Sequence, residues 1–172
     1  SKTLNGVQIT LKADVLDKLV SSGVKRFIID ADRMADFGFT LDTLKKLNQQ
    51  TSGNIVLKVK KITVTSVKAK AAIKKRPVYD ISLWEVKNVK KTKLTNLWGK
   101  TISIAIPYTP KKNEQPGNLY AVFVNGKGKP QWITRSSYDA DQKAVTFEFT
   151  KSGVYGVGYK AKKPVLTDIN NH

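Results

Sequence analysis

The sequence has no cysteine, and its single histidine, His172, is the last residue. Without cysteine there is no disulfide framework, no thiol nucleophile and no thiolate metal site. The internal serines, such as Ser103 and Ser152, have no imidazole base, which excludes a Ser-His-Asp nucleophile. A Ser-Lys arrangement stays open, although no motif marks one. We therefore expect no catalytic residue, no metal site and no cofactor, in a protein that is not an enzyme.

Long apolar runs are missing as well. No segment approaches the roughly 20 apolar residues of a membrane span, so we expect none. The N-terminus lacks the apolar core of a signal peptide. That absence, with the terminal position of His172, favours a piece excised from a longer chain over a cytosolic protein. Neighbouring domains of such a chain are then expected partners.

Acidic residues are scarce, and the formal net charge is +18. No acidic residue occurs between Asp42 and Asp80, where ten basic residues fall. Because arginine supplies only four of the 31 basic residues, the composition favours diffuse attraction for polyanions over the bidentate contacts of nucleic-acid readers. A solubilising surface remains the alternative. The predicted polyanion-binding residues are Lys58, Lys60, Lys61, Lys68, Lys70, Lys74, Lys75 and Arg76.

Hydrophobic periodicity in residues 1–66 predicts a small α/β unit of order β-α-β-β-α-β. Gly23 is expected to end the first helix, and Thr40 to cap the second. Leu41, Leu44 and Leu47 form the buried stripe of that second helix. The predicted elements are strand 7–11, helix 13–22, strand 26–29, strand 36–39, helix 40–50 and strand 54–65.

Residues 77–162 alternate apolar and polar residues between turn signals, as an antiparallel β-sandwich does. Asn125-Gly126 predicts a tight hairpin turn with positive φ, and Tyr138 to Lys143 predicts a second turn. The predicted fold class is therefore α+β, an N-terminal small β-α-β-β-α-β unit followed by an antiparallel β-sandwich. Between them, residues 67–76 are predicted as a basic linker or edge, with a short helix as an alternative. Residues 163–172 are predicted as a tail.

Short motifs in the second half carry a family resemblance. They are Ile106-Pro107-Tyr108, Asn125 to Lys127, Tyr138-Asp139, Val145 to Phe147 and Tyr155 to Tyr159. In this order the motifs resemble a module found next to S-layer homology repeats in Gram-positive bacterial cell-surface proteins. Members often carry His-Phe-Ser before the closing strand, whereas this chain has Lys151-Ser152-Gly153, so autoproteolysis is not implied.

The resemblance implies an extracellular location at the bacterial cell surface, and the charge implies attraction to anionic cell-wall polymer or polysaccharide. The leading hypothesis is a non-catalytic spacer or adaptor module with both properties. One alternative is a carbohydrate-binding module that uses Trp98 and Trp132 as a sugar platform. The other is a nucleic-acid-binding protein that uses residues 58–76.

Two local patterns resemble ligand sites and are better explained as turns. Asp30, Asp32 and Asp36 alternate like calcium ligands, but Met34 and Ala35 break the spacing of a standard loop, so turn-capping is expected. The glycine-lysine run 125–129 precedes a strand rather than a helix, which favours a hairpin turn over a phosphate loop.

Overall fold

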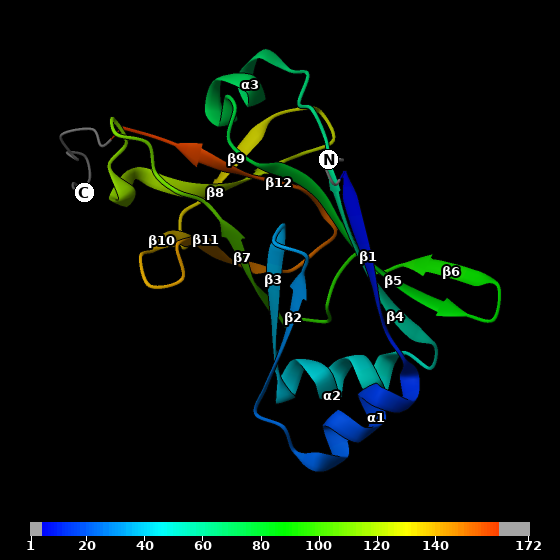
Figure 1. Cartoon of the computed structure of the whole chain (residues 1–172). Helices are drawn as coiled ribbons and strands as arrows, with labels where there is room; N and C mark the ends of the chain where they lie inside the picture. Colours follow the sequence, from blue (N-terminus) through cyan, green and yellow to red (C-terminus); the bar gives the residue numbers. More distant parts are fainter. Residues whose placement is uncertain (1–4, 162–172) are drawn as a thin grey trace, which may run out of the picture.

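The computed structural model describes residues 5–161 as an α+β architecture with three α-helices and two antiparallel sheets (Figure 1). The predicted α+β class is confirmed, while the predicted tail 163–172 lies outside the described residues. The helices are α1 (Ala13–Ser22), α2 (Leu41–Gln50) and α3 (Val67–Ile73), with one 3-10 turn, η1 (Pro116–Asn118). The strands are β1 (Gly6–Leu11), β2 (Arg26–Ala31), β3 (Ala35–Thr40), β4 (Asn54–Lys61), β5 (Val78–Lys87), β6 (Lys90–Lys93), β7 (Ile102–Pro107), β8 (Leu119–Val124), β9 (Pro130–Ile133), β10 (Ser137–Asp139), β11 (Ala144–Phe149) and β12 (Gly153–Tyr159).

The strand order mixes the two halves of the chain. The larger, seven-stranded sheet runs β1-β4-β5-β12-β8-β9, with β6 beside β5, and the smaller, five-stranded sheet runs β10-β11-β7-β3-β2. β4 therefore pairs with β5, and β3 with β7. The finer prediction, a unit at 1–66 followed by a separate sandwich at 77–162, is not confirmed, because strands of both parts share both sheets. A strand's own sequence gives its faces but does not record its hydrogen-bonding partner.

Both sheets contribute to one hydrophobic core. Alternation along β4 buries Ile55 and Leu57 on the inner face. Across the core, the ring of Tyr155 on β12 stacks on Phe147 of β11, with a centroid distance of 5.0 Å. Phe149 lies 5.5 Å from the same tyrosine ring. Burial of these aromatic side chains joins the two sheets and is a main source of stability.

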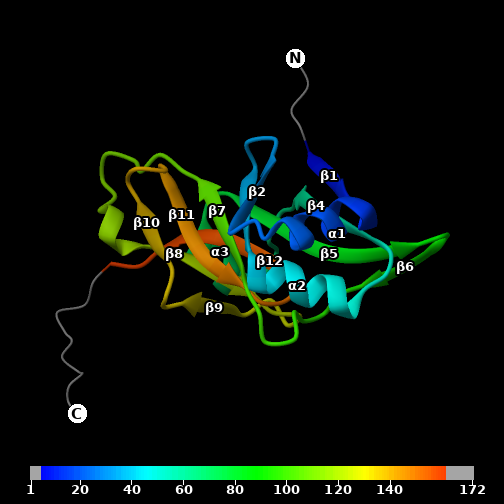
Figure 2. The same ribbon diagram turned by 90° about the horizontal axis from the view of Figure 1, so that it is seen from below.

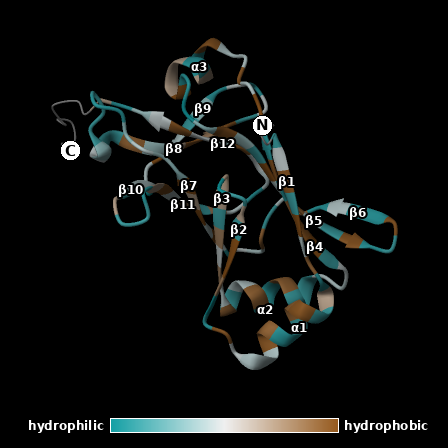
Figure 3. Ribbon diagram, viewed as in Figure 1, coloured by the Kyte–Doolittle hydropathy of each residue, from teal (hydrophilic) through white to brown (hydrophobic). Residues whose placement is uncertain are grey.

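Helices α1 and α2 lie side by side (Figures 1 and 2), and Figure 1 shows them at the opposite end of the molecule from α3. Gly23, at φ 69°, ends α1 as expected, because glycine adopts the left-handed conformation without steric cost. The Thr40 side chain accepts a hydrogen bond from Thr43 N and starts α2, also as expected. In Figure 3, α1 and α2 carry both hydrophobic and hydrophilic colours, as amphipathic helices do. Leucines such as Leu44 and Leu47 of α2 are buried in the core.

Two predicted turns differ in detail from the structure. The β8–β9 hairpin is present, but its turn spans Asn125 to Lys129, and the positive φ of 79° falls at Gly128 rather than at Gly126. The Asn125 side chain accepts from both Lys127 N and Lys129 N, which stabilises the longer turn. The second turn spans residues 140–143 between β10 and β11, because Tyr138 and Asp139 belong to β10 and pair with β11. β12 then crosses to the other sheet.

Helix α3 occupies the segment predicted as a basic linker or edge, so the short-helix alternative is the one observed. It packs on the face of the larger sheet that points away from the core, which we call the outer face. Ala69, Ala72 and Ile73 contact Val124 and Trp132 there. The β12-β8-β9 half of the outer face is therefore covered. α3 also contacts Val78 at the start of β5. Among residues 5–161, no helix lies over the rest of this face, which β1, β4, β6 and the remainder of β5 form (Figure 1).

Candidate polyanion-binding surface

The start of α3 is fixed by Ser66 and by the β8–β9 turn. The Ser66 hydroxyl accepts a hydrogen bond from Ala69 N and donates one to the carbonyl of Gly128. Gly128 has positive φ, and a side chain there would meet Ser66, so glycine suits both the turn and the close approach. These contacts hold the lysines of α3 in place relative to the larger sheet.

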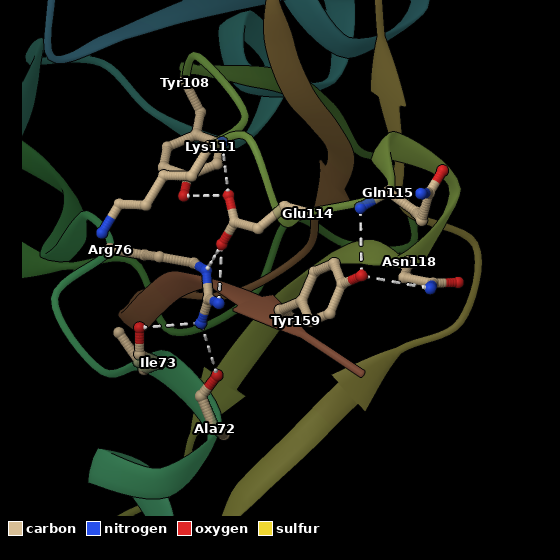
Figure 4. A network of polar contacts seen from close by, with 9 residues as sticks. All are labelled: Ala72, Ile73, Arg76, Tyr108, Lys111, Glu114, Gln115, Asn118 and Tyr159. Carbon is tan, nitrogen blue, oxygen red and sulfur yellow. Dashed lines mark hydrogen bonds and ion pairs between the residues drawn. The ribbon is translucent and has the colours of Figure 1, made fainter. Parts of the chain in front are cut away.

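The end of α3 is held by a buried ion pair between Arg76 and Glu114 (Figure 4). Their side chains are only 9% and 4% exposed, and Nη2 and Nε of Arg76 lie 2.7 and 2.8 Å from Oε2 of Glu114. Arg76 Nη1 also donates to the carbonyls of Ala72 and Ile73 at the last turn of the helix. The guanidinium thus ties α3 to the loop before η1.

The other carboxylate oxygen of Glu114, Oε1, accepts two further hydrogen bonds. It accepts from the Tyr108 hydroxyl at 2.6 Å and from Lys111 N at 2.8 Å. Burial would raise the pKa of Glu114, but the bonds from Lys111, Tyr108 and Arg76, with the positive charge of Arg76, outweigh burial and lower it. Burial and the neighbouring carboxylate raise the pKa of Tyr108. Arg76, predicted to bind a polyanion, is therefore occupied by an internal partner.

Four of the predicted lysines converge beyond that ion pair. Two adjoining recesses of about 560 and 420 Å³ share Ile62, Thr63 and Val78 in their linings, between the end of β4 and the end of α3. The exposed lysines of these recesses come from both elements and from the turn after the helix. We call the recesses together the basic groove, and its lysines are Lys61, Lys70, Lys74 and Lys75.

The groove lysines have no carboxylate partner within residues 5–161, where the one ion pair joins Arg76 and Glu114. Lys68, also on α3, is exposed but does not line the groove. Like charges gathered in a recess focus a positive potential into it. The arrangement can therefore hold a chain of anionic groups without first breaking an internal salt bridge.

The open half of the outer face carries a second set of lysines. Lys58 and Lys60 project there from β4. Trp84 of β5 lies between them and the lysines of β6, because it pairs with Val56 on one side and Lys93 on the other. The ammonium groups of Lys58 and Lys93 are 4.7 and 5.3 Å from the Trp84 ring centroid, within cation–π range.

The two tryptophans predicted as a sugar platform are both partly buried by packing. Trp98 lies in the loop between β6 and β7, at φ 52°, and contacts the main core. Trp132 lies on β9 beside α3 and meets Tyr120 edge-to-face at 6.1 Å. The structure does not bring the two rings into one platform, since they pack on different hydrophobic clusters.

Carboxylates elsewhere act mainly in turns. Asp30 accepts a hydrogen bond from Arg33 N in the β2–β3 hairpin, the turn-capping role expected for it. Partial burial, with Asp30 nearby, raises the pKa of Asp36. In the part of the chain that the structure describes, no group of three His, Cys, Asp or Glu residues could hold a metal ion.

Sequence reasoning missed the Trp84 neighbourhood. The alternation of β5 contains the signal, since Tyr79, Ile81 and Leu83 are buried while Ser82 and Trp84 share the opposite face. The lysines of β6 join this face only through the β5–β6 hairpin, whose turn has Asn88 at φ 57°. Sorting the predicted strand into two faces would have placed Trp84 outward.

In comparisons with known proteins, no family model and no curated protein matches the sequence. Among the helices of residues 5–161, none is long and apolar enough to cross a membrane.

Proposed function

We propose that this chain is a non-catalytic module of a bacterial cell-surface protein. It acts outside the cell as a spacer or adaptor and associates with anionic wall polymer through the basic groove. The resemblance of its second-half motifs to Gram-positive surface modules supports the location. The single observation that supports the adhesion is the convergence of Lys61, Lys70, Lys74 and Lys75 without a carboxylate partner among the described residues.

A polymer fits this surface better than a small anion does. The groove consists of two adjoining recesses, and its Lys61 follows directly after Lys60, which belongs to the outer-face lysines. Residues two apart on a strand are separated by roughly 6.4–6.8 Å, so Lys58 and Lys60 form a row that a repeating anion can follow. Exposed lysines bind weakly one at a time, and several contacts in sequence are needed for useful affinity.

Replacing the four groove lysines by glutamine is expected to weaken binding to purified anionic wall polymer strongly at low salt. Each lost ionic contact reduces the slope of log affinity against log salt by up to about 0.7–0.9, so the slope should become shallower by roughly 3. The midpoint of thermal unfolding should change little, because exposed charges contribute about 0–1 kcal/mol each. Co-sedimentation over a salt series measures the affinity.

The matched control replaces four exposed lysines near α1 and α2, which removes the same charge from another part of the molecule: Lys12, Lys18, Lys25 and Lys45. This control should retain most of the wild-type affinity. Equal losses in the two variants would show that the attraction is spread over the whole surface. No binding of the wild type at low salt would remove the adhesive role and leave a spacer.

DNA would also be drawn to these lysines and would give a similar salt dependence. Competition between duplex DNA and wall polymer for the wild-type chain separates the two partners. Displacement of bound wall polymer only by a large excess of DNA is the result expected for a wall-binding module. Displacement by DNA at equal phosphate concentration would favour the nucleic-acid function.

A further inference from the structure

The open half of the outer face contains a recess of about 170 Å³ beside Trp84. Val56 and Val86 give it an apolar floor, and Val56 is only 4% exposed. Its rim has an amide from Gln8, a hydroxyl from Thr10 and the amide of Asn54. Lys58 and Lys91 complete the lining. We call this hollow the Trp84 recess.

The indole of Trp84 is held in one position by its neighbours. Its Nε1–H donates to the Ser82 hydroxyl at 2.8 Å. Lys58 and Lys93 lie over the ring at cation–π distances. The polar edge of the indole is thus used inside the protein, and a ligand ring that stacks on the indole takes the place of one of these ammonium groups. A ring fixed before binding loses little conformational entropy when a ligand stacks on it.

Asn54 is similarly fixed. Its Oδ1 accepts a hydrogen bond from Ala13 N, the first residue of α1, at 2.9 Å. This bond assigns the carbonyl oxygen to the helix and leaves the NH₂ group as the donor available at the recess. The rim therefore offers positioned polar groups around an apolar floor, the usual composition of a small-ligand site.

The chemistry of the lining selects among anionic ligands. A bare polyphosphate would use the lysines but not the ring and the valine floor. A neutral sugar would use the ring and the amides but leave the ammonium groups without partners. A sugar that carries an acidic group uses all three sets of contacts, because its ring stacks on the indole, its hydroxyls pair with the rim and its anion meets the lysines.

A single-stranded nucleic acid is the competing class, since bases also stack on aromatic side chains. Proteins that bind such strands usually offer several aromatic platforms to successive bases. On the outer face of β1, β4, β5 and β6, within the described residues, Trp84 is the single aromatic side chain. One platform surrounded by amides, a hydroxyl and lysines favours one sugar ring of an acidic polysaccharide.

We propose that the Trp84 recess binds one anionic sugar unit of a polysaccharide, with the sugar ring on the indole and its carboxylate or phosphate among Lys58, Lys91 and Lys93. The volume of the recess, about 170 Å³, suits one sugar ring, because an apolar cavity of roughly 150 Å³ admits one six-membered ring. The proposal rests on the wall-polymer function above and adds to it the chemical class of the unit that is recognised.

The test compares Trp84→Leu with the wild-type chain by titration calorimetry against three probes. Hexagalacturonate carries carboxylates on sugar rings, phosphorylated dextran carries phosphates on sugar rings, and linear polyphosphate has no ring. The variant should lose roughly tenfold in affinity for at least one sugar probe, as expected for a lost stacking contact, and less than about twofold for polyphosphate. The sugar probe that shows the loss identifies the acidic group.

Two further variants separate stacking from loss of structure. Trp84→Phe keeps an aromatic face and should restore most of the sugar affinity. Gln8→Ala, at an exposed rim position, should weaken the sugar probes severalfold and leave polyphosphate unchanged. Unchanged affinity of Trp84→Leu for both sugar probes would overturn the proposal. A larger Trp84-dependent loss with oligothymidylate than with either sugar would overturn it in favour of a base.

The experiments distinguish rejection of the sugar-binding role of the Trp84 recess from rejection of the wall-polymer function. Retained polyphosphate and wall-polymer binding, with no effect of Trp84→Leu on the sugar probes, rejects the recess alone. Absence of binding to every polyanion at low salt rejects both.

Discussion

Replacing Glu114 by glutamine is expected to lower the free energy of unfolding by about 3–5 kcal/mol, because it leaves the buried Arg76 charge without its carboxylate. Glutamine has nearly the same shape, so the loss reports charge rather than packing. The two side chains are 9% and 4% exposed, and solvent therefore screens the pair little. Urea unfolding of both proteins at about pH 7 measures the difference.

The difference in the free energy of unfolding between wild type and Glu114→Gln should become smaller as the pH falls. The native pKa of Glu114 is lowered, so the stability that its ionised form contributes is present above the unfolded value of about 4.3 and is lost as pH falls through the native pKa. The gap between wild type and Glu114→Gln should therefore narrow below about pH 4. Glu148→Gln is the control, since Glu148 is exposed and accepts hydrogen bonds from the hydroxyl groups of Thr101 and Ser103 rather than from a charged group within residues 5–161. Equal effects of both substitutions would contradict the role of the buried pair.

Truncating Phe149 to alanine should also cost about 3–5 kcal/mol, because it opens a cavity where the two sheets meet. Phe149 is 1% exposed on β11, and its ring packs on Tyr155 of the other sheet. Since strands of both halves of the sequence share this core, the whole chain should unfold in one cooperative transition at a lower temperature. Differential scanning calorimetry measures the number of transitions and the shift.

Ile28→Ala is the matched control for this truncation. Ile28 is 58% exposed on β2, so losing its side chain should cost far less than losing Phe149. Two resolved transitions, of which Phe149→Ala moves only one, would show that the halves fold independently, as separate domains at 1–66 and 77–162 would.

The helices could be predicted from the sequence because their signals are local. The α1 boundaries follow from an amphipathic stripe ended by Gly23, and the start of α2 follows from the Thr40 cap. Inner and outer faces of β4 could be predicted for the same reason, since alternation within one strand separates Leu57 from Lys58.

Strand partners could not be predicted in this way. β3 pairs with β7 and β4 with β5, and nothing in a strand's own alternation distinguishes these neighbours from others. The crossing of β12 into the larger sheet is equally non-local, because β12 pairs there with β5 and β8, and its Tyr155 stacks on Phe147 of the other sheet. Such choices are made by the packing of the whole core.

The candidate surface was predictable in part. The absence of acid from residues 43–79 indicated a concentrated positive charge, and four of its lysines do line one groove. Arg76 was grouped with them because its partner, Glu114, is 38 residues away and is surrounded in sequence by basic and polar residues. Local charge counting cannot find a partner that only the fold brings close.

The most direct measurement of the central claim is a map of lysine protection by mass spectrometry. The wild-type chain is acetylated under limiting reagent at low salt, with and without purified anionic wall polymer. The polymer is expected to slow acetylation of Lys61, Lys70, Lys74 and Lys75 and to leave Lys12 and Lys18 unprotected. Uniform protection of all exposed lysines, or protection confined to those near α1 and α2, would contradict the claim.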